Sequence, residues 1–262
     1  METIKDKIIL DIGAKSRSPL LIVKNIAHEG PGLLEEELEE CGIKYTVADL
    51  SSGQKFPPID SYGAVVVLGG PDSANDENEK MENELTRVRE VVASKIPYLG
   101  ICLGFQILIK SVNGKVTKSP VKEIGFIDPD GNNFTVELTD DGKDDPLFER
   151  LDHTFNVFHL HGETVELTDN IVGANGHAPL LLGSGKFCRN QIVRVGTNAY
   201  GIQCHFELTS EMFELWINKD HDLREVDKYQ LRVNFESIRD EYTRVGRQLF
   251  KNFLKISFGN DI

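Results

Sequence analysis

A strand that turns at once into a helix is indicated by residues 98–106, which read Tyr98-Leu99-Gly100-Ile101-Cys102-Leu103-Gly104-Phe105-Gln106. The apolar run at 96–101 is typical of a buried strand, and the apolar run at 103–112 is typical of a packed helix. One cysteine stands between them, with a glycine two positions before it and another two positions after. Small flanking residues let a sharp turn form without a Cβ clash. The stretch therefore predicts an α/β fold with Cys102 at a strand-to-helix turn.

Strand and helix signals alternate on both sides of this turn. Buried strands are predicted at residues 7–11, 43–50, 64–68 and 96–101. Helices are predicted at residues 19–41, 77–93 and 103–112, the first interrupted at 30–32 and ended by Gly42 as a C-cap. Alternation at this spacing predicts a three-layer α/β fold, in which a mostly parallel central sheet carries helices on both faces.

The pattern changes in the second half of the chain. Short strand-like runs dominate here, at residues 134–138, 155–160, 191–195 and 200–205. From residue 208 the chain becomes helical, with many charges at 226–256. We interpret residues 1–217 as one domain and residues 218–262 as a C-terminal helical extension packed on it.

Composition excludes several function classes. The chain has 262 residues, of which 40% are apolar and 27% charged, and this is typical of a globular protein. Its net charge of −13 disfavours binding to nucleic acids and to anionic membranes. The four cysteines form no Cys-x-x-Cys pair and are too sparse for a disulfide framework. The N-terminal residues show neither a signal-peptide core nor a long apolar span, so a cytoplasmic location is expected.

The predicted position of Cys102 suits a nucleophile. At a helix N-terminus the partial positive charge, about half an elementary charge, favours thiolate over thiol. A glycine on each side is the layout of a nucleophile elbow, with cysteine where hydrolases often carry serine. The alternative is a buried cysteine that packs as a small apolar residue.

A base for this nucleophile is predicted at His205. In a strand, His205 and Glu207 would point to the same face, where the carboxylate could orient the imidazole. The alternative is an edge histidine beside a solvated glutamate. Gly69 and Gly70 follow the strand at 64–68, at the end where parallel sheets bind ligands. The amide of Gly70 and that of Leu103 could then hold an oxyanion, although an ordinary β–α turn would also be glycine-rich.

Cofactor and metal signals are weak. His159 and His161 lie two residues apart, so a strand would place both imidazoles on one face, which could suit zinc or iron. No third ligand is evident from spacing, and we expect no metal. The stretches 11–16 and 183–187 each lack part of the phosphate-loop pattern, so no nucleotide cofactor is expected.

Three motifs together resemble the class I, or triad-type, glutamine amidotransferase family. They occur in the family's order: Gly69-Gly70-Pro71-Asp72-Ser73, then Gly100-Ile101-Cys102-Leu103-Gly104-Phe105-Gln106, then Gly201-Ile202-Gln203-Cys204-His205-Phe206-Glu207. The resemblance covers roughly residues 7–217 and is to the standalone kind, similar to the glutaminase part of GMP synthase. It implies a flavodoxin-like sheet.

The resemblance also implies roles for individual residues. Cys102 corresponds to the nucleophile, His205 to the base and acid, and Glu207 to the group that orients it. The amides of Gly70 and Leu103 correspond to the oxyanion hole. The substrate-binding positions correspond to Gly69, Gln106, Leu160 and His161. The family's usual His-Pro-Glu is His205-Phe206-Glu207 here, which puts efficiency in question more than identity.

The implied function is hydrolysis of the glutamine side-chain amide through a γ-glutamyl thioester, with ammonia passed to an acceptor synthetase. Two alternatives stay open: a freestanding hydrolase of γ-glutamyl amides or peptides, and a binding or regulatory homologue without turnover. The presence of Cys102, His205 and Glu207 argues against the last of these. Ammonia release from glutamine, compared with a panel of γ-glutamyl amines, would separate the first two.

Overall fold

The computed structural model describes residues 18–167, 171 and 178–260. Its strands are β1 (Leu20–Lys24), β2 (Tyr45–Asp49), β3 (Ala64–Val67), β4 (Tyr98–Ile101), β5 (Lys115–Gly125), β6 (Thr135–Leu138), β7 (Thr154–Asn156), β8 (His159–Glu166), β9 (Leu180–Ser184), β10 (Ile192–Val195) and β11 (Ala199–Ile202). Its helices are α2 (Leu33–Glu40), α3 (Glu79–Ala93), α4 (Leu103–Ser111), α5 (Asp140–Lys143), α6 (Ser210–Lys219) and α7 (Lys228–Phe258), with short 3₁₀ turns η1 (Leu50–Ser52), η2 (Pro146–Phe148) and η3 (Asp222–Glu225).

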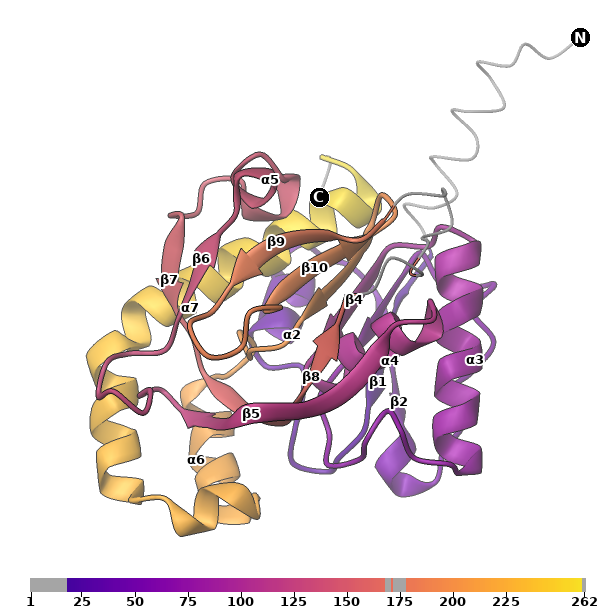
Figure 1. The fold of residues 1–262 in the computed structure, drawn as a ribbon. Helices are drawn as coiled ribbons and strands as arrows, with labels where there is room; N and C mark the ends of the chain where they lie inside the picture. Colours follow the sequence, from indigo (N-terminus) through magenta and orange to yellow (C-terminus); the bar gives the residue numbers. More distant parts are fainter. Residues whose placement is uncertain (1–17, 168–170, 172–177, 261–262) are drawn as a thin grey trace, which may run out of the picture.

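Nine of these strands form the central sheet, in the order β2-β1-β3-β4-β11-β10-β9-β6-β7. The first five run parallel to one another, and the strands beyond β11 pair antiparallel. A separate antiparallel pair, β5 with β8, lies in front of the sheet in Figure 1. The parallel half requires crossover connections: α2 lies between β1 and β2 and α3 between β3 and β4, whereas η1 and a loop join β2 to β3.

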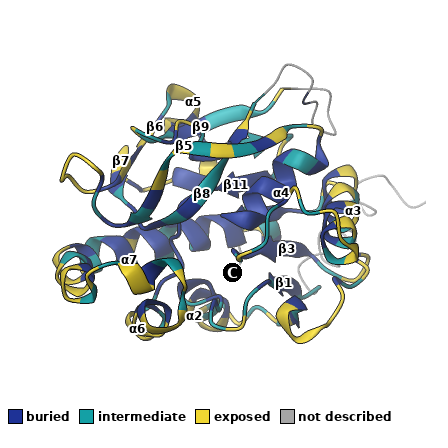
Figure 2. Cartoon of the chain, turned by 60° about the horizontal axis from the view of Figure 1, so that its bottom comes forward, coloured by how far each residue is buried: buried dark blue, intermediate teal, exposed yellow. Residues whose placement is uncertain are grey.

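Each face of the sheet has its own apolar core. Along β1, Leu20 and Ile22 face one core while Leu21 and Val23 face the other, the alternation expected of a strand covered on both sides. Helices α3 and α4 cover the second of these faces, and α2, α6 and α7 cover the first. In Figure 2 the central strands β3 and β11 and the inward helix faces are dark blue, whereas β5 and β9 carry intermediate residues and the outer helix faces are exposed. The predicted three-layer α/β architecture is confirmed.

One predicted element is wrong. The helix expected over residues 19–41 is instead strand β1 followed, after a loop, by the short helix α2. The run Leu20-Leu21-Ile22-Val23 is apolar at every position, and this pattern fits a strand buried on both faces better than an amphipathic helix. Gly42 follows α2 with φ of 65°, as a C-cap glycine should. The strand predicted at residues 7–11 lies outside the described residues.

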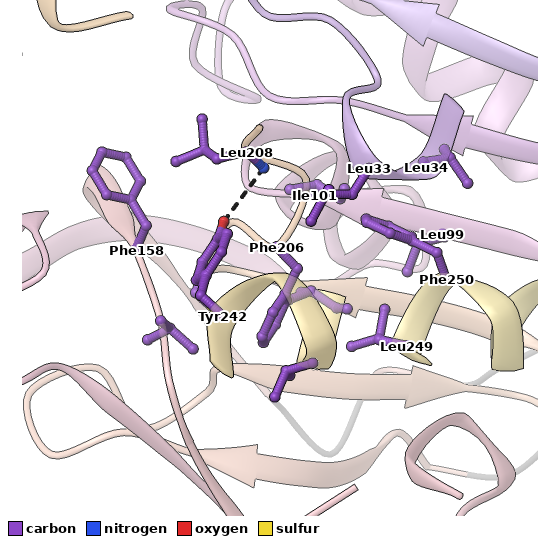
Figure 3. Close-up of a cluster of buried hydrophobic side chains, with 14 of the residues drawn as sticks. Leu33, Leu34, Leu99, Ile101, Phe158, Phe206, Leu208, Tyr242, Leu249 and Phe250 are labelled. Carbon is purple, nitrogen blue, oxygen red and sulfur yellow. Dashed lines mark hydrogen bonds between the residues drawn. The ribbon is translucent and has the colours of Figure 1, made fainter. Parts of the chain in front are cut away.

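The long C-terminal helix α7 packs on the same core as the sheet. Tyr242 is fully buried, and its hydroxyl donates to the carbonyl of His205 (2.9 Å) and accepts from the amide of Leu208 (3.4 Å; Figure 3). Phe206 stacks at 6.5 Å from the Tyr242 ring. The helix thus holds the segment that carries His205. Among the described helices, α7 included, none has the length and apolar character needed to cross a bilayer.

Substituting Gly246 tests how closely α7 approaches this segment. A methyl group on Gly246 would lie 2.4 Å from the backbone oxygen of Phe206. Gly-to-Ala in a helix interior normally stabilises by roughly 0.5–1 kcal/mol, but overpacking against backbone typically costs about 1–3 kcal/mol. We expect Gly246→Ala to lower the free energy of unfolding, as measured by urea denaturation. Ser237→Ala, exposed on the same helix, is the control; a stabilised Gly246→Ala would show that the approach is looser than described.

Candidate active site

The ends of four neighbouring parallel strands converge at one edge of the sheet. The chain leaves β1 toward Glu29, β3 toward Gly69, β4 toward Cys102 and β11 toward His205. Carboxyl ends of parallel strands meet at the same edge, and this is where α/β sheets bind ligands. The topology therefore brings together residues that lie far apart in the chain.

Cys102 lies on a strained turn between β4 and α4. Its φ of 52° and ψ of −104° belong to a region that few non-glycine residues adopt. The flanking glycines are required by space: a methyl group on Gly100 would lie 2.4 Å from the carbonyl of Gly104, and one on Gly104 would lie 2.1 Å from the oxygen of Val67. The turn presents the thiol at the N-terminus of α4, where the helix dipole favours a negative charge.

His205 and Glu207 form a buried pair on the segment after β11. Nδ1 of His205 is 2.6 Å from Oε1 of Glu207, and both side chains are 1% exposed. The backbone amide of Phe206 donates to Oε2 of the same carboxylate, at 2.9 Å. Strand β11 ends at Ile202, earlier than expected, and His205 makes only an isolated bridge with Phe158. The two side chains nevertheless meet.

The protonated imidazole is favoured at His205. Burial opposes the charge, but the Glu207 carboxylate and the thiol of Cys102 outweigh it and hold the pKa of His205 well above its usual value. Glu207 occupies Nδ1, which leaves Nε2 as the ring nitrogen able to exchange a proton. A histidine charged beside a cysteine is the arrangement that stabilises a thiolate.

Gly69 lies next to both Cys102 and His205. A methyl group built on Gly69 would lie 2.7 Å from Oε2 of Glu29, 3.1 Å from Cε1 of His205 and 3.6 Å from Cβ of Cys102. These three side chains therefore surround Gly69. Among the residues that the structure describes, Gly69 does not line the cavity beside them.

A cavity of about 710 Å³ opens over Cys102. The other residues predicted from the sequence line it: Gly70, Leu103, Gln106, Leu160 and His161. Sγ of Cys102 lies 3.8 Å from the carbonyl oxygen of Leu160 and 3.6 Å from Nε2 of Gln203. The amide of Gln106 is held by hydrogen bonds to the Glu163 carbonyl and to Gln203, both at 3.3 Å. Polar and charged side chains complete the wall: Asp72, Ser73, Lys118, Lys122, Glu163, Asp220, His221 and Asp222.

Glu29 is a site residue that the sequence patterns did not reveal. It lines the cavity, is 5% exposed, and its Oε2 has no hydrogen-bond partner among the described residues. Burial raises its pKa to about 7, the His205 charge opposing and the Glu207 charge adding to this shift. The sequence does contain a signal for a loop here, because a polar pair at 28–29 followed by Gly-Pro-Gly is typical of a loop after a strand. The prediction of a helix at 19–41 assigned these residues to the helix instead.

Glu29→Gln should change how stability depends on pH. The carboxyl is protonated up to about pH 7 when folded but only up to about 4.5 when unfolded, so the folded state binds more protons between these values. Wild-type stability therefore falls as pH rises from about 4.5 to 7, and the neutral amide removes this loss. We expect urea denaturation at pH 4.5 and 8 to show that the free energy of unfolding of Glu29→Gln, relative to that of wild type, is higher at pH 8 than at pH 4.5. An equal difference at both pH values would contradict the raised pKa.

Comparison with known proteins identifies the family of this chain. The family model "Glutamine amidotransferase class-I" matches residues 32–220. The chain belongs to this family. The glutamine amidotransferase-like protein YfeJ of Salmonella typhimurium is 29% identical over 192 residues, covering 71% of this chain and 74% of its own. Members of the family hydrolyse the glutamine amide with a cysteine nucleophile and transfer ammonia.

Other relatives are parts of larger assemblies or larger chains. The chain is 27% identical to a separate glutamine-hydrolysing GMP synthase subunit of Sulfurisphaera tokodaii, covering 67% of this chain and 82% of that one. The GMP synthase of Thermosipho melanesiensis is 28% identical, but the chain spans only 34% of its length. A solved glutamine amidotransferase from Thermotoga maritima superposes with a TM-score of 0.77 at 24% identity, over 91% of this chain and 99% of that one. This last likeness shows the same fold.

Proposed function

We propose that this amidotransferase hydrolyses the side-chain amide of glutamine, with Cys102 as nucleophile, His205 as base and acid, and Glu207 as the group that orients the imidazole. The observation that carries the proposal is the convergence at Gly69, where Cys102 and the His205–Glu207 pair meet beneath a single cavity. A buried cysteine that only packs would need neither the strained turn nor the charged histidine.

The reaction follows from these positions. The Cys102 thiolate attacks the γ-carbonyl carbon, and the carbonyl π electrons move to oxygen. The amides of Gly70 and Leu103, both on the cavity wall, would receive that oxyanion. His205 donates its Nε2 proton to the leaving nitrogen, ammonia departs, and a γ-glutamyl thioester remains. Water, deprotonated by the same nitrogen, then breaks the thioester, which releases glutamate and restores the thiolate.

We further propose that the ammonia serves a separate synthetase subunit. The support is the match to a relative whose name makes it one subunit of a glutamine-hydrolysing GMP synthase. Residues 1–217 would form the amidotransferase domain. Residues 218–262 would be an extension that supports it, in keeping with the contacts of Tyr242 to the His205 segment.

A second candidate substrate class is favoured by the cavity. Its volume of about 710 Å³ falls in the range of drug-sized ligands, and its wall includes Lys118 and Lys122. Lys122 lies 2.8 Å from Asp222 on the same wall, so Lys118 is the cation that suits a carboxylate on a larger leaving group, such as the amino acid of a γ-glutamyl peptide. Water, rather than a synthetase, would then receive the γ-glutamyl group.

One experiment tests both. Steady-state kcat/KM is measured for glutamine and for γ-glutamyl amines and dipeptides, with product glutamate quantified. Ammonia release from glutamine at the highest kcat/KM supports the amidotransferase; preference for a dipeptide supports the hydrolase. Absence of glutamate from every substrate overturns the catalytic proposal.

A further inference from the structure

Four buried polar side chains meet where β8 packs behind the cavity. His159 and His161 share one face of β8, and Glu123 lies opposite His161 in the register of β5 with β8. Gln191, just before β10, reaches the same place, with Nε2 3.5 Å from Glu123. All four residues are between 0% and 4% exposed. The ligand atoms of Glu123, His159 and His161 lie within 4.8 Å of one another.

The hydrogen bond of His161 leaves its second ring nitrogen facing the carboxylate of Glu123, so that two lone pairs point at each other. Nδ1 of His161 lies 3.0 Å from the backbone oxygen of Glu163, which can only accept, so Nδ1 must carry a proton. In the neutral ring Nε2 is then a bare acceptor, and it lies 2.9 Å from the Oε2 of Glu123. Two acceptors at this distance repel unless something electropositive lies beside them.

Two more polar atoms in the cluster lack partners. Nδ1 of His159 and Oε1 of Gln191 have no hydrogen-bond partner among the residues described, and neither does Nε2 of His161. A buried polar group that is left without a partner destabilises the fold. A proton on Nε2 of His161 would relieve only its contact with Glu123. A single cation that accepts electron pairs from all three side chains would relieve the whole group.

The chemistry of the donors matches a transition metal. Two imidazoles and one carboxylate are a common zinc set, with a fourth position left for water or for the Gln191 oxygen. His159 and His161 are both buried on one face of β8, and the ligand atoms of the three residues lie within 4.8 Å of one another. The Glu163 carbonyl accepts from Nδ1 of His161 and so orients the ring, as the hydrogen-bond partners of metal-bound histidines do.

We propose that Glu123, His159 and His161 bind one divalent transition-metal ion, with Zn²⁺ the best match. The ion would join β5 to β8 and so fix the strand whose Leu160 carbonyl lies 3.8 Å from Sγ of Cys102. Its role is to tie the two strands together, because its ligands come from both β5 and β8. The third ligand comes from the strand register, which spacing along the sequence does not reveal.

Metal content tests this proposal independently of turnover. The full chain is stripped with a chelator, re-titrated with Zn²⁺, and its metal is quantified by mass spectrometry. The same is done for Glu123→Gln, His159→Gln and the control His153→Gln, whose side chain is exposed. Losing a hydrogen-bond partner of a ligand weakens metal sites about 10–100-fold, so loss of a ligand itself should weaken Zn²⁺ binding by about 100-fold or more. His153→Gln should bind one equivalent like wild type.

Cobalt spectroscopy of the wild-type protein guards against variants that do not fold. Co²⁺ on nitrogen and oxygen ligands should give visible d–d bands without a strong thiolate charge-transfer band. A thiolate band would place the ion on a cysteine and overturn the assignment. The assignment also fails if wild type binds less than stoichiometric Zn²⁺, or if folded His159→Gln binds it as tightly as wild type; a buried water then satisfies the cluster.

Discussion

Cys102→Ala should lower kcat for glutamine hydrolysis by about 10⁴-fold or more, because no other group at the site can form the thioester. In the proposed mechanism, the strained turn and the adjacent imidazole act through the sulfur at this position. Stability should change little, since the residue is small and lies at the cavity wall. The measurement is glutamate production at saturating glutamine, together with thermal unfolding of the same samples.

The other three cysteines supply the control. Burial raises the pKa of Cys41, raises that of Cys188 to about 11, and raises that of Cys204 well above its usual value. A glutamine-like electrophile should therefore label Cys102 alone in wild type, as read by peptide mass spectrometry, and Cys41→Ala should retain full activity. Labelling of Cys204 in place of Cys102, or activity that survives Cys102→Ala, would remove Cys102 from the role.

Local sequence patterns predicted most of the parallel half of the fold. The apolar run at β3 is short, rich in Val and lies between Gly63 and Gly69, and the run at β4 is short and follows Pro97, so a strand fits both better than a helix. The turn at Cys102 was equally readable, because the glycines at 100 and 104 are needed for backbone contacts within the turn itself. The cavity residues Gln106 and Leu160 were predicted instead from the resemblance to the family, and both line the cavity.

Features that depend on long-range packing could not be read in this way. Residues 20–24 became a strand because the sheet buries them on both faces, while their run into a glutamate-rich helix favoured a helical interpretation. Glu123 joins the two histidines only through the register of β5 with β8. Glu29 reaches the cavity only because β1 is a strand. In each case the partner lies far away in the chain.

Phe206 shows how a departure from the family's pattern can be accommodated. Proline, usual at this position, has no amide proton, whereas Phe206 donates its amide to Oε2 of Glu207. Its ring is buried against Phe155 and Tyr242, which ties the segment to the core. The carboxylate is therefore held from both sides, by His205 at Oε1 and by the backbone at Oε2.

Glu207→Gln should lower kcat by about 10²–10⁴-fold while leaving the fold intact. Both oxygens of Glu207 accept hydrogen bonds, one from Nδ1 of His205 and one from the Phe206 amide. A glutamine amide has only one acceptor oxygen, so its NH₂ group must face one of these two donors. If the NH₂ group faces His205, Nδ1 can no longer donate to position 207 and the orientation of the ring is lost. If it faces the Phe206 amide, that backbone hydrogen bond is lost.

The pH profile separates this loss of orientation from a loss of structure. The Glu207 charge helps to raise the pKa of His205 against burial, so the amide should let that pKa fall. Catalysis needs the charged imidazole to protonate the leaving amide nitrogen, and the alkaline limb of kcat should therefore move to lower pH. The charged His205–Glu207 pair contributes fully to the free energy of unfolding below about pH 6.5, and this contribution is lost as the pH rises through the raised pKa of His205. Glu207→Gln should therefore be less stable than wild type at pH 6, and the difference should shrink at alkaline pH. Glu211→Gln, exposed on α6, is the matched control; an unshifted limb in Glu207→Gln would show that the carboxylate does not act through His205.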